Sequence, residues 1–248
     1  MAVTVTAQVP AEDVLIPRAR PGAAPLLACL ARPADGEPRP AIVIIHELYG
    51  LNDNIRDIAR RFADAGYVAL AVDLFSGSGN HRLCILRLMS ALALRPLKNK
   101  GLSDLRRSID WLQARPEVDA NRVGAIGFCM GGGYALALAC VESDLRASSA
   151  FYCANPCPLS ALKRACPIAG SYPEDDWSAR SGQKLDAALD RYNIPHDVKI
   201  YPGAGHSFFN DTLDGYHPEA AADSWQRTLA FFAEHMGRDV EDSPETTP

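Results

Sequence analysis

Short apolar runs recur along the chain, and they alternate with longer segments whose apolar residues are spaced as on one face of a helix. The clearest run, residues 41–45 (AIVII), is typical of a strand buried on both faces of a sheet. Runs of the same kind predict further strands at residues 67–72, 123–128, 147–152, 167–172 and 196–201. Alternating segments nearer the N-terminus predict antiparallel edge strands at residues 3–6 (VTVT), 14–16 and 26–30.

Helical spacing of apolar residues predicts helices between and after these strands. The first follows a cap at Asp53 or Asn54 and runs through Asp64, and the others cover residues 81–97, 103–114, a segment starting near Gly131, 182–192 and 218–236. The helix at 81–97 is expected to cover the functional site rather than to form the core. Strands alternating with helices predict an α/β fold, a mostly parallel doubly wound sheet with helices on both faces. We expect one domain over residues 1–240 and a disordered tail at 241–248.

Composition narrows the class of protein. The 248 residues are 48% hydrophobic and 22% charged, and the net charge of −5 gives no reason to expect a nucleic-acid partner. The apolar runs are too short to cross a bilayer, and the N-terminus lacks the pattern of a signal peptide. Seven cysteines in such a chain are expected to be reduced thiols in the cytoplasm. Cys153 and Cys157 have no second cysteine pair or nearby histidine that would complete a zinc site, so neither a metal nor another cofactor is expected.

Residues 127–131 (GFCMG) place Cys129 between two glycines, at the junction of a predicted strand and a predicted helix. This is the G-x-S-x-G nucleophile elbow with cysteine in place of serine. Larger side chains at the glycine positions would collide in so sharp a turn, and the helix N-terminus favours a thiolate and later an oxyanion. The N–H groups of Met130, and of Leu48 after an earlier strand, are placed to form an oxyanion hole. The alternative is a buried cysteine in an ordinary glycine-rich turn.

Reactive side chains also follow other predicted strands. In an open parallel sheet, functional sites form beyond the carboxyl ends of the strands. His206 follows the last strand in a glycine-containing loop (GAGHS) and could accept a proton from the thiol or from water. Glu174, Asp175 and Asp176 follow another strand, and we favour Asp176 over Asp175 as the carboxylate that orients His206. Nucleophile, acid and histidine then occur in the α/β-hydrolase order. The alternatives are a loop histidine bonded to backbone and a solvated acidic turn.

Glu47 ends a fully buried strand, where a carboxylate is costly unless it has a partner. The ordinary partner would be His46 or an arginine such as Arg56 or Arg82. The functional partner would be the Cys129 thiol, which an adjacent carboxylate could hydrogen-bond or deprotonate.

The stretches HELYGLN, DLF, GFCMGGG and YPGAGHSF resemble those of the dienelactone hydrolase family, over almost the whole chain from about Val14 to His235. A cysteine at the elbow combined with a glutamate after an earlier strand is much more specific than the elbow alone. The resemblance implies the α/β-hydrolase fold. The site that it implies consists of a Cys129/His206/Asp176 triad, Glu47 activating the thiol when substrate enters, and Leu48 and Met130 as oxyanion donors.

The chain departs from this family where the substrate would bind. Members specific for dienelactones hold the substrate carboxylate with arginines, one of them shortly after the histidine, where this chain has Asn210. The other arginine would lie in the covering segment, where Arg82 and Arg87 are candidates. A guanidinium clamp is a strong specificity device for carboxylates, so its absence weakens the case for an anionic lactone. The candidate lining of a partly aromatic pocket is Tyr49, Trp177 and Phe208.

The expected activity is cleavage of a small ester or lactone through an acyl-enzyme on Cys129. One alternative is a short-chain carboxylesterase for neutral esters. A second, from another class, is a non-catalytic redox-sensing protein with Cys129 as its reactive thiol, although a sensor needs neither a histidine nor an acid in hydrolase order. The expected partner is the small-molecule substrate, without nucleic acid or membrane, and the chain is expected to be a monomer or small homo-oligomer.

Overall fold

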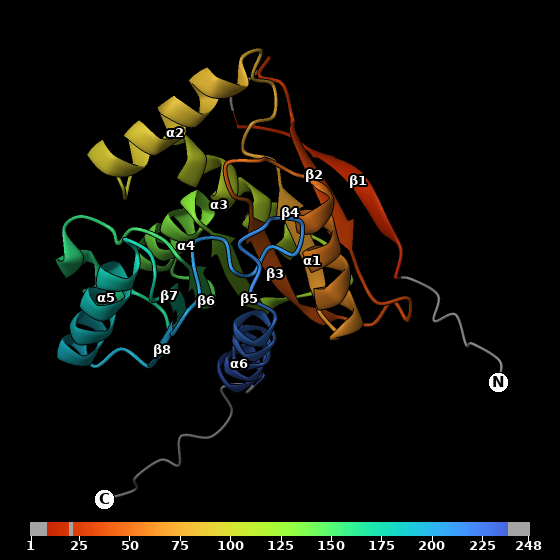
Figure 1. The fold of residues 1–248 in the computed structure, drawn as a ribbon. Helices are drawn as coiled ribbons and strands as arrows, with labels where there is room; N and C mark the ends of the chain where they lie inside the picture. The colour runs from red at the N-terminus through yellow and green to blue at the C-terminus, as the bar shows by residue number, and fades with distance from the viewer. Residues whose placement is uncertain (1–8, 20–21, 238–248) are drawn as a thin grey trace, which may run out of the picture.

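Eight strands form one sheet in the order β1-β2-β4-β3-β5-β6-β7-β8, as the ribbon in Figure 1 shows. The structure is a computed structural model that describes residues 9–19 and 22–237. The strands are β1 (Ala11–Ile16), β2 (Leu26–Ala31), β3 (Arg39–Ile45), β4 (Val68–Val72), β5 (Val118–Phe128), β6 (Leu145–Phe151), β7 (Ile168–Pro173) and β8 (His196–Tyr201). β1 and β2 are antiparallel to their neighbours and β3 to β8 are mutually parallel, as predicted. The strand predicted at 3–6 and the tail predicted at 241–248 lie outside the described residues.

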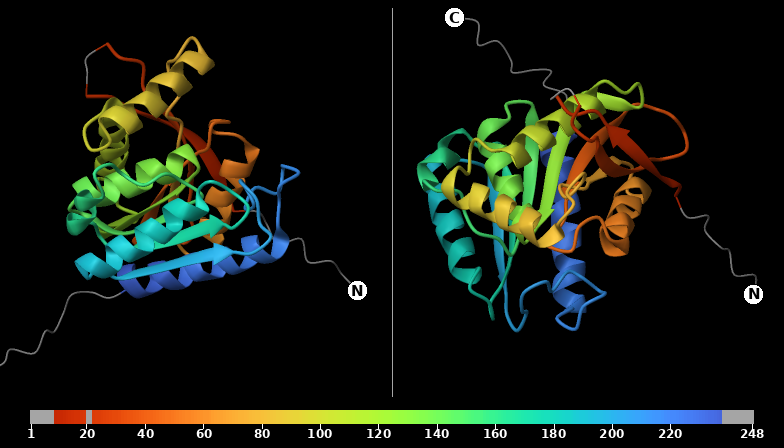
Figure 2. Two further views of the ribbon diagram at one scale, coloured as in Figure 1. Left: turned by 60° about the vertical axis from the view of Figure 1, so that its left-hand side comes forward. Right: turned by 90° about the horizontal axis from the view of Figure 1, so that it is seen from above.

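The core lies on both faces of the sheet, because alternate residues of a strand point to opposite sides. The helices are α1 (Asp53–Asp64), α2 (His81–Leu94), α3 (Lys100–Gln113), α4 (Met130–Val141), α5 (Ala179–Tyr192) and α6 (Pro218–Met236). In β3, Ala41, Val43 and Ile45 belong to the apolar cluster that contains α3, α4 and α5. Ile42 and Ile44 belong to the cluster that contains α1 and α6. The predicted α/β fold with helices on both faces is confirmed, and the two views of Figure 2 show the layers.

Asparagine side chains set the start of two helices and correct their predicted boundaries. α1 begins after Asn52, whose Oδ1 accepts the N–H of Ile55 at 3.0 Å, so neither Asp53 nor Asn54 is the cap. α3 begins three residues earlier than the apolar spacing predicts, because Asn99 caps it in the same way. Apolar spacing locates the buried face of a helix, whereas the first turn is fixed by a polar side chain that the spacing does not register.

Helix α2 stands apart from the other helices, above the layer that contains α3 and α4 (Figures 1 and 2). Among its side chains only Leu88 is buried, and the carbonyl of that residue accepts the Tyr134 hydroxyl of α4 at 3.0 Å. The helix ends at Leu94 rather than at residue 97. At its N-terminus, the ring of His81 lies 3.1 Å from the carbonyl oxygen of Leu48, in the turn after β3. The N-terminus of the helix therefore contacts the turn that follows β3.

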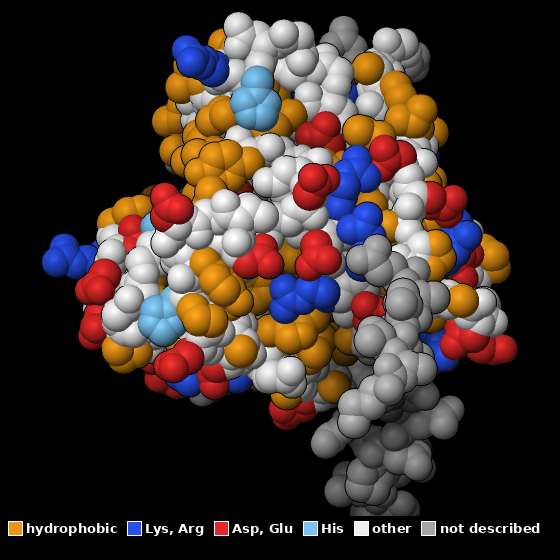
Figure 3. All heavy atoms as spheres, turned by 45° about the vertical axis from the view of Figure 1, so that its right-hand side comes forward, with side chains coloured by type: hydrophobic (Ala, Val, Ile, Leu, Met, Phe, Trp, Pro, Cys, Tyr) orange, Lys and Arg blue, Asp and Glu red, His pale blue; other side chains and the backbone are white. Residues whose placement is uncertain are grey.

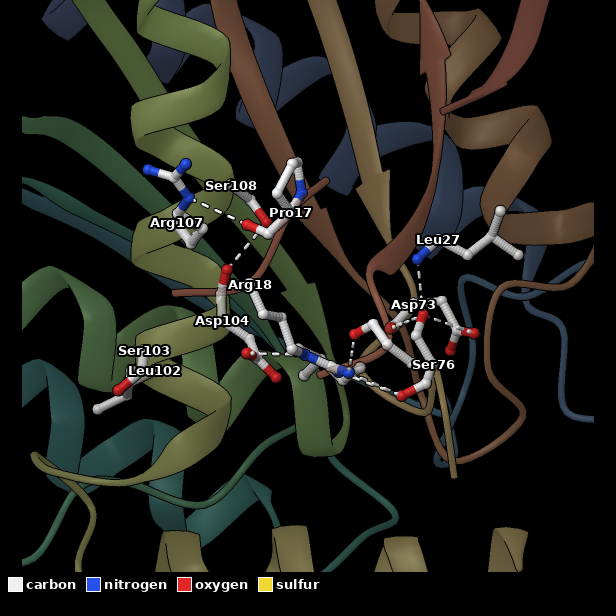
Figure 4. A network of polar contacts seen from close by, with 12 residues as sticks. Pro17, Arg18, Leu27, Asp73, Ser76, Leu102, Ser103, Asp104, Arg107 and Ser108 are labelled. Atoms are coloured by element: carbon white, nitrogen blue, oxygen red, sulfur yellow. Dashed lines mark hydrogen bonds and ion pairs between the residues drawn. The ribbon is translucent and has the colours of Figure 1, made fainter. Parts of the chain in front are cut away.

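A buried ion pair ties three segments together beneath α2 (Figure 4). Arg18, which follows β1, donates from Nε to Oδ1 of Asp104 in α3 at 3.1 Å, and both side chains are almost completely buried. The same guanidinium donates to the carbonyl of Ala24 at 2.8 Å and to that of Ser76, after β4, at 3.1 and 3.2 Å. Because these hydrogen bonds are charge-assisted and the Arg18 and Asp104 side chains are largely buried, the pair fixes the loop that follows β4.

We expect Asp104→Ala to lower the free energy of unfolding by about 3–5 kcal/mol, because it leaves the buried Arg18 without its counter-charge. Chemical denaturation monitored by circular dichroism measures this. Asp110→Ala is the matched control on the same helix. Its carboxylate is 63% exposed and pairs with Arg107 only at 3.9 Å, so its loss should cost less than about 1 kcal/mol. Equal effects of the two substitutions would contradict this account of the pair.

Candidate active site

Cys129 lies at a sharp turn between β5 and α4. Its φ of 53° and ψ of −115° place a non-glycine residue in a strained, left-handed conformation. Two close backbone approaches require the flanking glycines. A Cβ at Gly127 would lie 2.0 Å from the carbonyl oxygen of Gly131, and a Cβ at Gly131 would lie 2.2 Å from that of Ile45. The residues 127–131 therefore form the strained strand-to-helix turn that a nucleophile elbow requires.

The turn brings Cys129 to His206, and His206 to Asp176. Sγ of Cys129 lies 3.3 Å from Nε2 of His206, and Nδ1 of the same ring lies 2.9 Å from Oδ2 of Asp176. The loop after β7 supplies Asp176 and the loop after β8 supplies His206. Ser178 donates both its N–H, at 3.2 Å, and its hydroxyl to Oδ2 of Asp176. A carboxylate fixed in this way holds the Nδ1–H tautomer of His206 and leaves Nε2 to accept a proton from the thiol.

The other two acidic residues of this loop do not meet the histidine. Glu174 and Asp175 are exposed, and it is their backbone N–H groups that bond, at 3.0 Å each, to the carbonyls of Tyr201 and Ala204. These two bonds join the loop after β7 to the loop after β8. They leave Asp176 as the carboxylate beside His206.

Glu47 is only 4% exposed, and neutral side chains hold it. Oε1 accepts the hydroxyl of Ser207 at 3.1 Å, and Oε2 accepts the Nδ2 amide of Asn210 at 3.0 Å. The hydroxyl of Tyr152 is also hydrogen-bonded to this carboxylate. Sequence reasoning missed all three partners. The signal for two of them was the polar pair in SFFN directly after the histidine.

The partners that the sequence suggested for Glu47 lie elsewhere. Arg56 pairs with Asp13, and the ring of His46 turns to the backbone carbonyl of Glu47 rather than to its carboxylate. Within the described residues the hydrogen bonds of the carboxylate go to the loop after β8 and to Tyr152, not to the thiol. The prediction of a histidine, arginine or thiol partner is therefore corrected, because a folded-back loop supplies neutral donors instead.

The thiol of Cys129 is held in its neutral form. Burial raises its pKa, the negative charge of Glu47 raises it further, and the net result is a pKa of about 11. A hydrogen bond from the backbone N–H of Met130 lowers the pKa, but not enough to offset these effects. Asp176 adds a smaller upward contribution. In the resting site the sulfur is therefore a thiol beside an imidazole that can take its proton.

The predicted substrate-binding residues divide into two groups. Trp177 is 60% exposed and its ring lies 6.0 Å from that of His206, nearly parallel, while Tyr49 is 58% exposed beside the turn that follows Glu47. Arg82 is exposed on α2. Phe208 is fully buried and packs in the core, so its prediction as a pocket residue is wrong: its ring has no free face for a substrate.

A family model described as "Dienelactone hydrolase family" matches residues 26–236. The chain belongs to this family. A protein of Saccharolobus solfataricus named "Putative carboxymethylenebutenolidase" is 36% identical, and the match covers 84% of this chain and 93% of that protein. The structure is similar to a "Putative Dienelactone Hydrolase" from Klebsiella pneumoniae, with a TM-score of 0.80 and 30% identity over 91% of this chain and 99% of that chain.

A dienelactone hydrolase-like promiscuous phosphotriesterase from metagenomic libraries superimposes with a TM-score of 0.79 and 26% identity, over 93% of this chain and 100% of that chain. These likenesses identify an enzyme of the dienelactone hydrolase type, a carboxylic ester hydrolase with the α/β-hydrolase fold.

Three further observations on this dienelactone hydrolase family member concern its surface charge, its helices and its possible metal ligands. Acidic and basic side chains are interspersed over the face shown in Figure 3. Among the helices of the described residues, none is long and apolar enough to cross a bilayer. Within residues 9–19 and 22–237, no group of three or more histidine, cysteine or acidic side chains could hold a metal ion.

We expect Glu47→Gln to lower the pKa of Cys129 below about 11, because it removes the negative charge that opposes thiolate formation. Each unit by which the pKa falls raises the thiolate fraction below the pKa about tenfold. The rate of iodoacetamide alkylation of Cys129 between about pH 7 and 11, resolved by peptide mass spectrometry, should therefore increase at the lower pH values. Asp175→Asn, which removes an exposed carboxylate, is the matched control and should leave the profile unchanged. An unchanged profile in Glu47→Gln would contradict the assigned cause.

Proposed function

We propose that this enzyme cleaves a small ester or lactone through a thioester formed at Cys129. The observation that carries the proposal is the continuous chain of contacts from sulfur to imidazole to carboxylate, 3.3 and 2.9 Å long, at a strained elbow. A histidine bonded only to backbone would not bridge a thiol and a carboxylate. The arrangement is that of nucleophile, general base and orienting acid.

The reaction uses the described groups in two half-reactions. Sγ of Cys129 attacks the carbonyl carbon as its proton moves to Nε2 of His206, and the oxyanion forms against the N–H groups of Leu48 and Met130. When this tetrahedral intermediate collapses, the acyl–oxygen bond breaks, and the leaving alcohol takes the proton from His206. Water then attacks the thioester, His206 takes a proton from that water, and the thiol leaves with the proton returned to it.

Glu47 helps to control the protonation of the thiol in this proposal. Its charge suppresses the thiolate in the resting enzyme, and Ser207, Asn210 and Tyr152 keep the carboxylate in place. Glu47 could take the thiol proton in place of His206 only if its carboxylate turned away from Ser207 and Asn210. Activation by an entering substrate therefore costs at least two hydrogen bonds to neutral donors, each worth about 1 kcal/mol net and more where the acceptor is charged.

The redox-sensing alternative is less well supported by the same observations. A sensor requires a thiolate at physiological pH, whereas burial and the charge of Glu47 hold the pKa of Cys129 at about 11. The nucleophile must still remain reduced, and all seven cysteines are free thiols. We therefore propose that the enzyme works in a reducing compartment, the cytoplasm.

The proposed substrate is uncharged at its acyl group. Asn210 stands where dienelactone-specific relatives are expected to carry an arginine, and its side chain is already used. Its Nδ2 donates to Glu47, and its Oδ1 accepts from the N–H and the hydroxyl of Thr212 at 3.1 and 2.7 Å. Asn210 is therefore fixed by Glu47 and Thr212, and it carries no positive charge to hold a substrate carboxylate. The exposed rings of Tyr49 and Trp177 are the proposed contacts for an apolar acyl or alcohol group.

We expect Asp176→Asn to reduce kcat for p-nitrophenyl acetate by about 10³- to 10⁴-fold, because His206 then loses the carboxylate that sets its tautomer. Asp175→Asn, in the same loop but exposed, is the control and should retain wild-type turnover. Steady-state kinetics measures both variants. Wild-type turnover in Asp176→Asn would refute the proposed triad.

We also expect the wild type to prefer neutral aryl esters to a carboxylate-bearing dienelactone, since Asn210 supplies no positive charge to pair with that carboxylate. The comparison of kcat/KM for the two substrates measures this preference. Arg82→Ala and Arg87→Ala test the two remaining candidate cations on α2, because each substitution should leave neutral-ester turnover unchanged. A higher kcat/KM for the dienelactone, lowered selectively by one of them, would overturn the neutral-substrate proposal and assign that arginine to the substrate carboxylate.

A further inference from the structure

Two histidines hold the turn that follows β3, residues 46–50. Nδ1 of His46 lies 2.5 Å from the carbonyl oxygen of Glu47, and Nε2 of His81, at the start of α2, lies 3.1 Å from the carbonyl oxygen of Leu48. The two peptide groups that flank Leu48 are thus each bound by an imidazole. One histidine is fully buried within the turn, and the other reaches it from the covering helix.

The hydrogen bonds fix which nitrogen of His46 carries the proton. The N–H of Leu74 can only donate, and it points to Nε2 of His46 at 3.0 Å, so Nε2 is the acceptor. The proton of the neutral ring is therefore on Nδ1, from which it is donated to the carbonyl of Glu47. Oδ1 of Asp73 lies 3.6 Å from Nε2 and accepts the N–H of Phe75 at 2.9 Å instead. The network thus assigns a neutral, Nδ1-protonated His46.

The ring of Phe75 contacts both histidines. Its centroid lies 4.6 Å from that of His46 in a tilted arrangement and 4.4 Å from that of His81 in an edge-to-face arrangement. Gly50, with a φ of 76°, closes the turn against Phe75, where a Cβ would lie 3.2 Å from the ring. The N-terminus of α2 is therefore coupled to the turn through a bond from His81 and through packing.

The orientation of the Leu48 N–H follows from these contacts. The Glu47–Leu48 peptide is trans, because the only cis bond among the described residues is Cys157–Pro158. In a trans peptide the N–H points opposite to the C=O, so fixing the carbonyl of Glu47 against His46 also fixes the direction of the Leu48 N–H. The backbone at Gly131 packs against the carbonyls of Ile45 and His46, so this turn adjoins the Cys129 elbow.

We propose that His46 and His81 are positioning residues that aim the Leu48 N–H at the oxyanion. The inference rests on the proposed function, because only an acyl-transfer reaction generates that oxyanion. Neither histidine touches the reacting atoms. They act through the two carbonyls that flank Leu48. A donor misaimed by their loss stabilises the oxyanion of the transition state less than a correctly aimed donor does, whereas the ground state carries no oxyanion to lose.

The pair His46→Asn and His46→Leu isolates the donor. Both substitutions remove the imidazole acceptor of the Leu74 N–H, and the two side chains have the same number of heavy atoms and the same branching at Cγ. Asn can place an amide N–H near the position of Nδ1, whereas Leu cannot. We expect His46→Leu to lower kcat for p-nitrophenyl acetate by about 10- to 100-fold with little change in KM, and His46→Asn to retain most of the activity. The two variants should lose similar amounts of thermal stability.

Alkylation of Cys129 by iodoacetamide separates positioning from general disruption of the site. This displacement generates no oxyanion, so its rate should be the same in the wild type and in both His46 variants. His81→Ala tests the inference at an exposed position, independently of folding, with an expected fall in kcat of about 3- to 10-fold. Leu86→Ala, also exposed on α2, is its control and should leave kcat unchanged.

Equal kcat values in His46→Asn and His46→Leu, or wild-type kcat in His81→Ala, would overturn the positioning role while leaving the proposed function intact. A fall in alkylation that parallels the fall in kcat would likewise overturn it, because the thiol itself would then be disturbed. A wild type that hydrolyses no ester would overturn the proposed function first and this inference with it.

Discussion

The close approach of helix α4 to the end of β3 is the constraint on which the site depends. It requires glycine at position 131, where any Cβ would meet the carbonyl of Ile45, and it requires the strained backbone of Cys129. The approach places the helix N-terminus, the sulfur and the turn with Glu47 and Leu48 in one location. Parallel strands supply the remaining groups, because their carboxyl ends all lie at the same edge of the sheet.

Glu47, a buried carboxylate without a cationic partner among the described residues, helps to keep the Cys129 thiol protonated in the resting site. Glu47 is buried, and its hydrogen bonds within the described chain come from neutral groups, which stabilise the carboxylate without cancelling its charge. Burial of Cys129 and, after it, the charge of Glu47 raise the pKa of the thiol, which stays protonated beside His206. In the proposed mechanism the thiolate is therefore generated during the reaction rather than present in the resting enzyme. A protonated thiol is also less readily oxidised, because the thiolate is the reactive species.

Much of the architecture could be predicted from the sequence, because buried strands and amphipathic helices leave clear apolar patterns. The parallel sheet, its helices on both faces and the family were all predicted correctly. The starts of α1 and α3 were missed, since a capping asparagine is a single polar residue outside the periodic pattern. The contact between His206 and Asp176 was expected, because chain order and strand ends carry that information without three-dimensional detail.

The surroundings of Glu47 and the position of Phe208 could not be predicted in this way. Both depend on the loop after β8, which folds back over the sheet. Within that loop, Ser207 and Asn210 turn to the carboxylate, while Phe208 turns into the core. A loop has no fixed period, so the alternation that assigns the faces of a strand gives no information there. The same limit applies to His46. Its proposed role depends on the backbone carbonyl of Glu47 and the backbone N–H of Leu74, and nearly every residue has such groups, so the sequence does not mark them.

The most direct test of the central claim is to identify the covalent intermediate. The wild type is mixed with p-nitrophenyl acetate, quenched in acid within milliseconds and digested for peptide mass spectrometry. The account predicts an acetyl group on Cys129, formed during the first turnover and removed by neutral hydroxylamine, and no turnover in Cys129→Ala. Acetylation of another residue at the catalytic rate, or ester turnover that persists in Cys129→Ala, would contradict it.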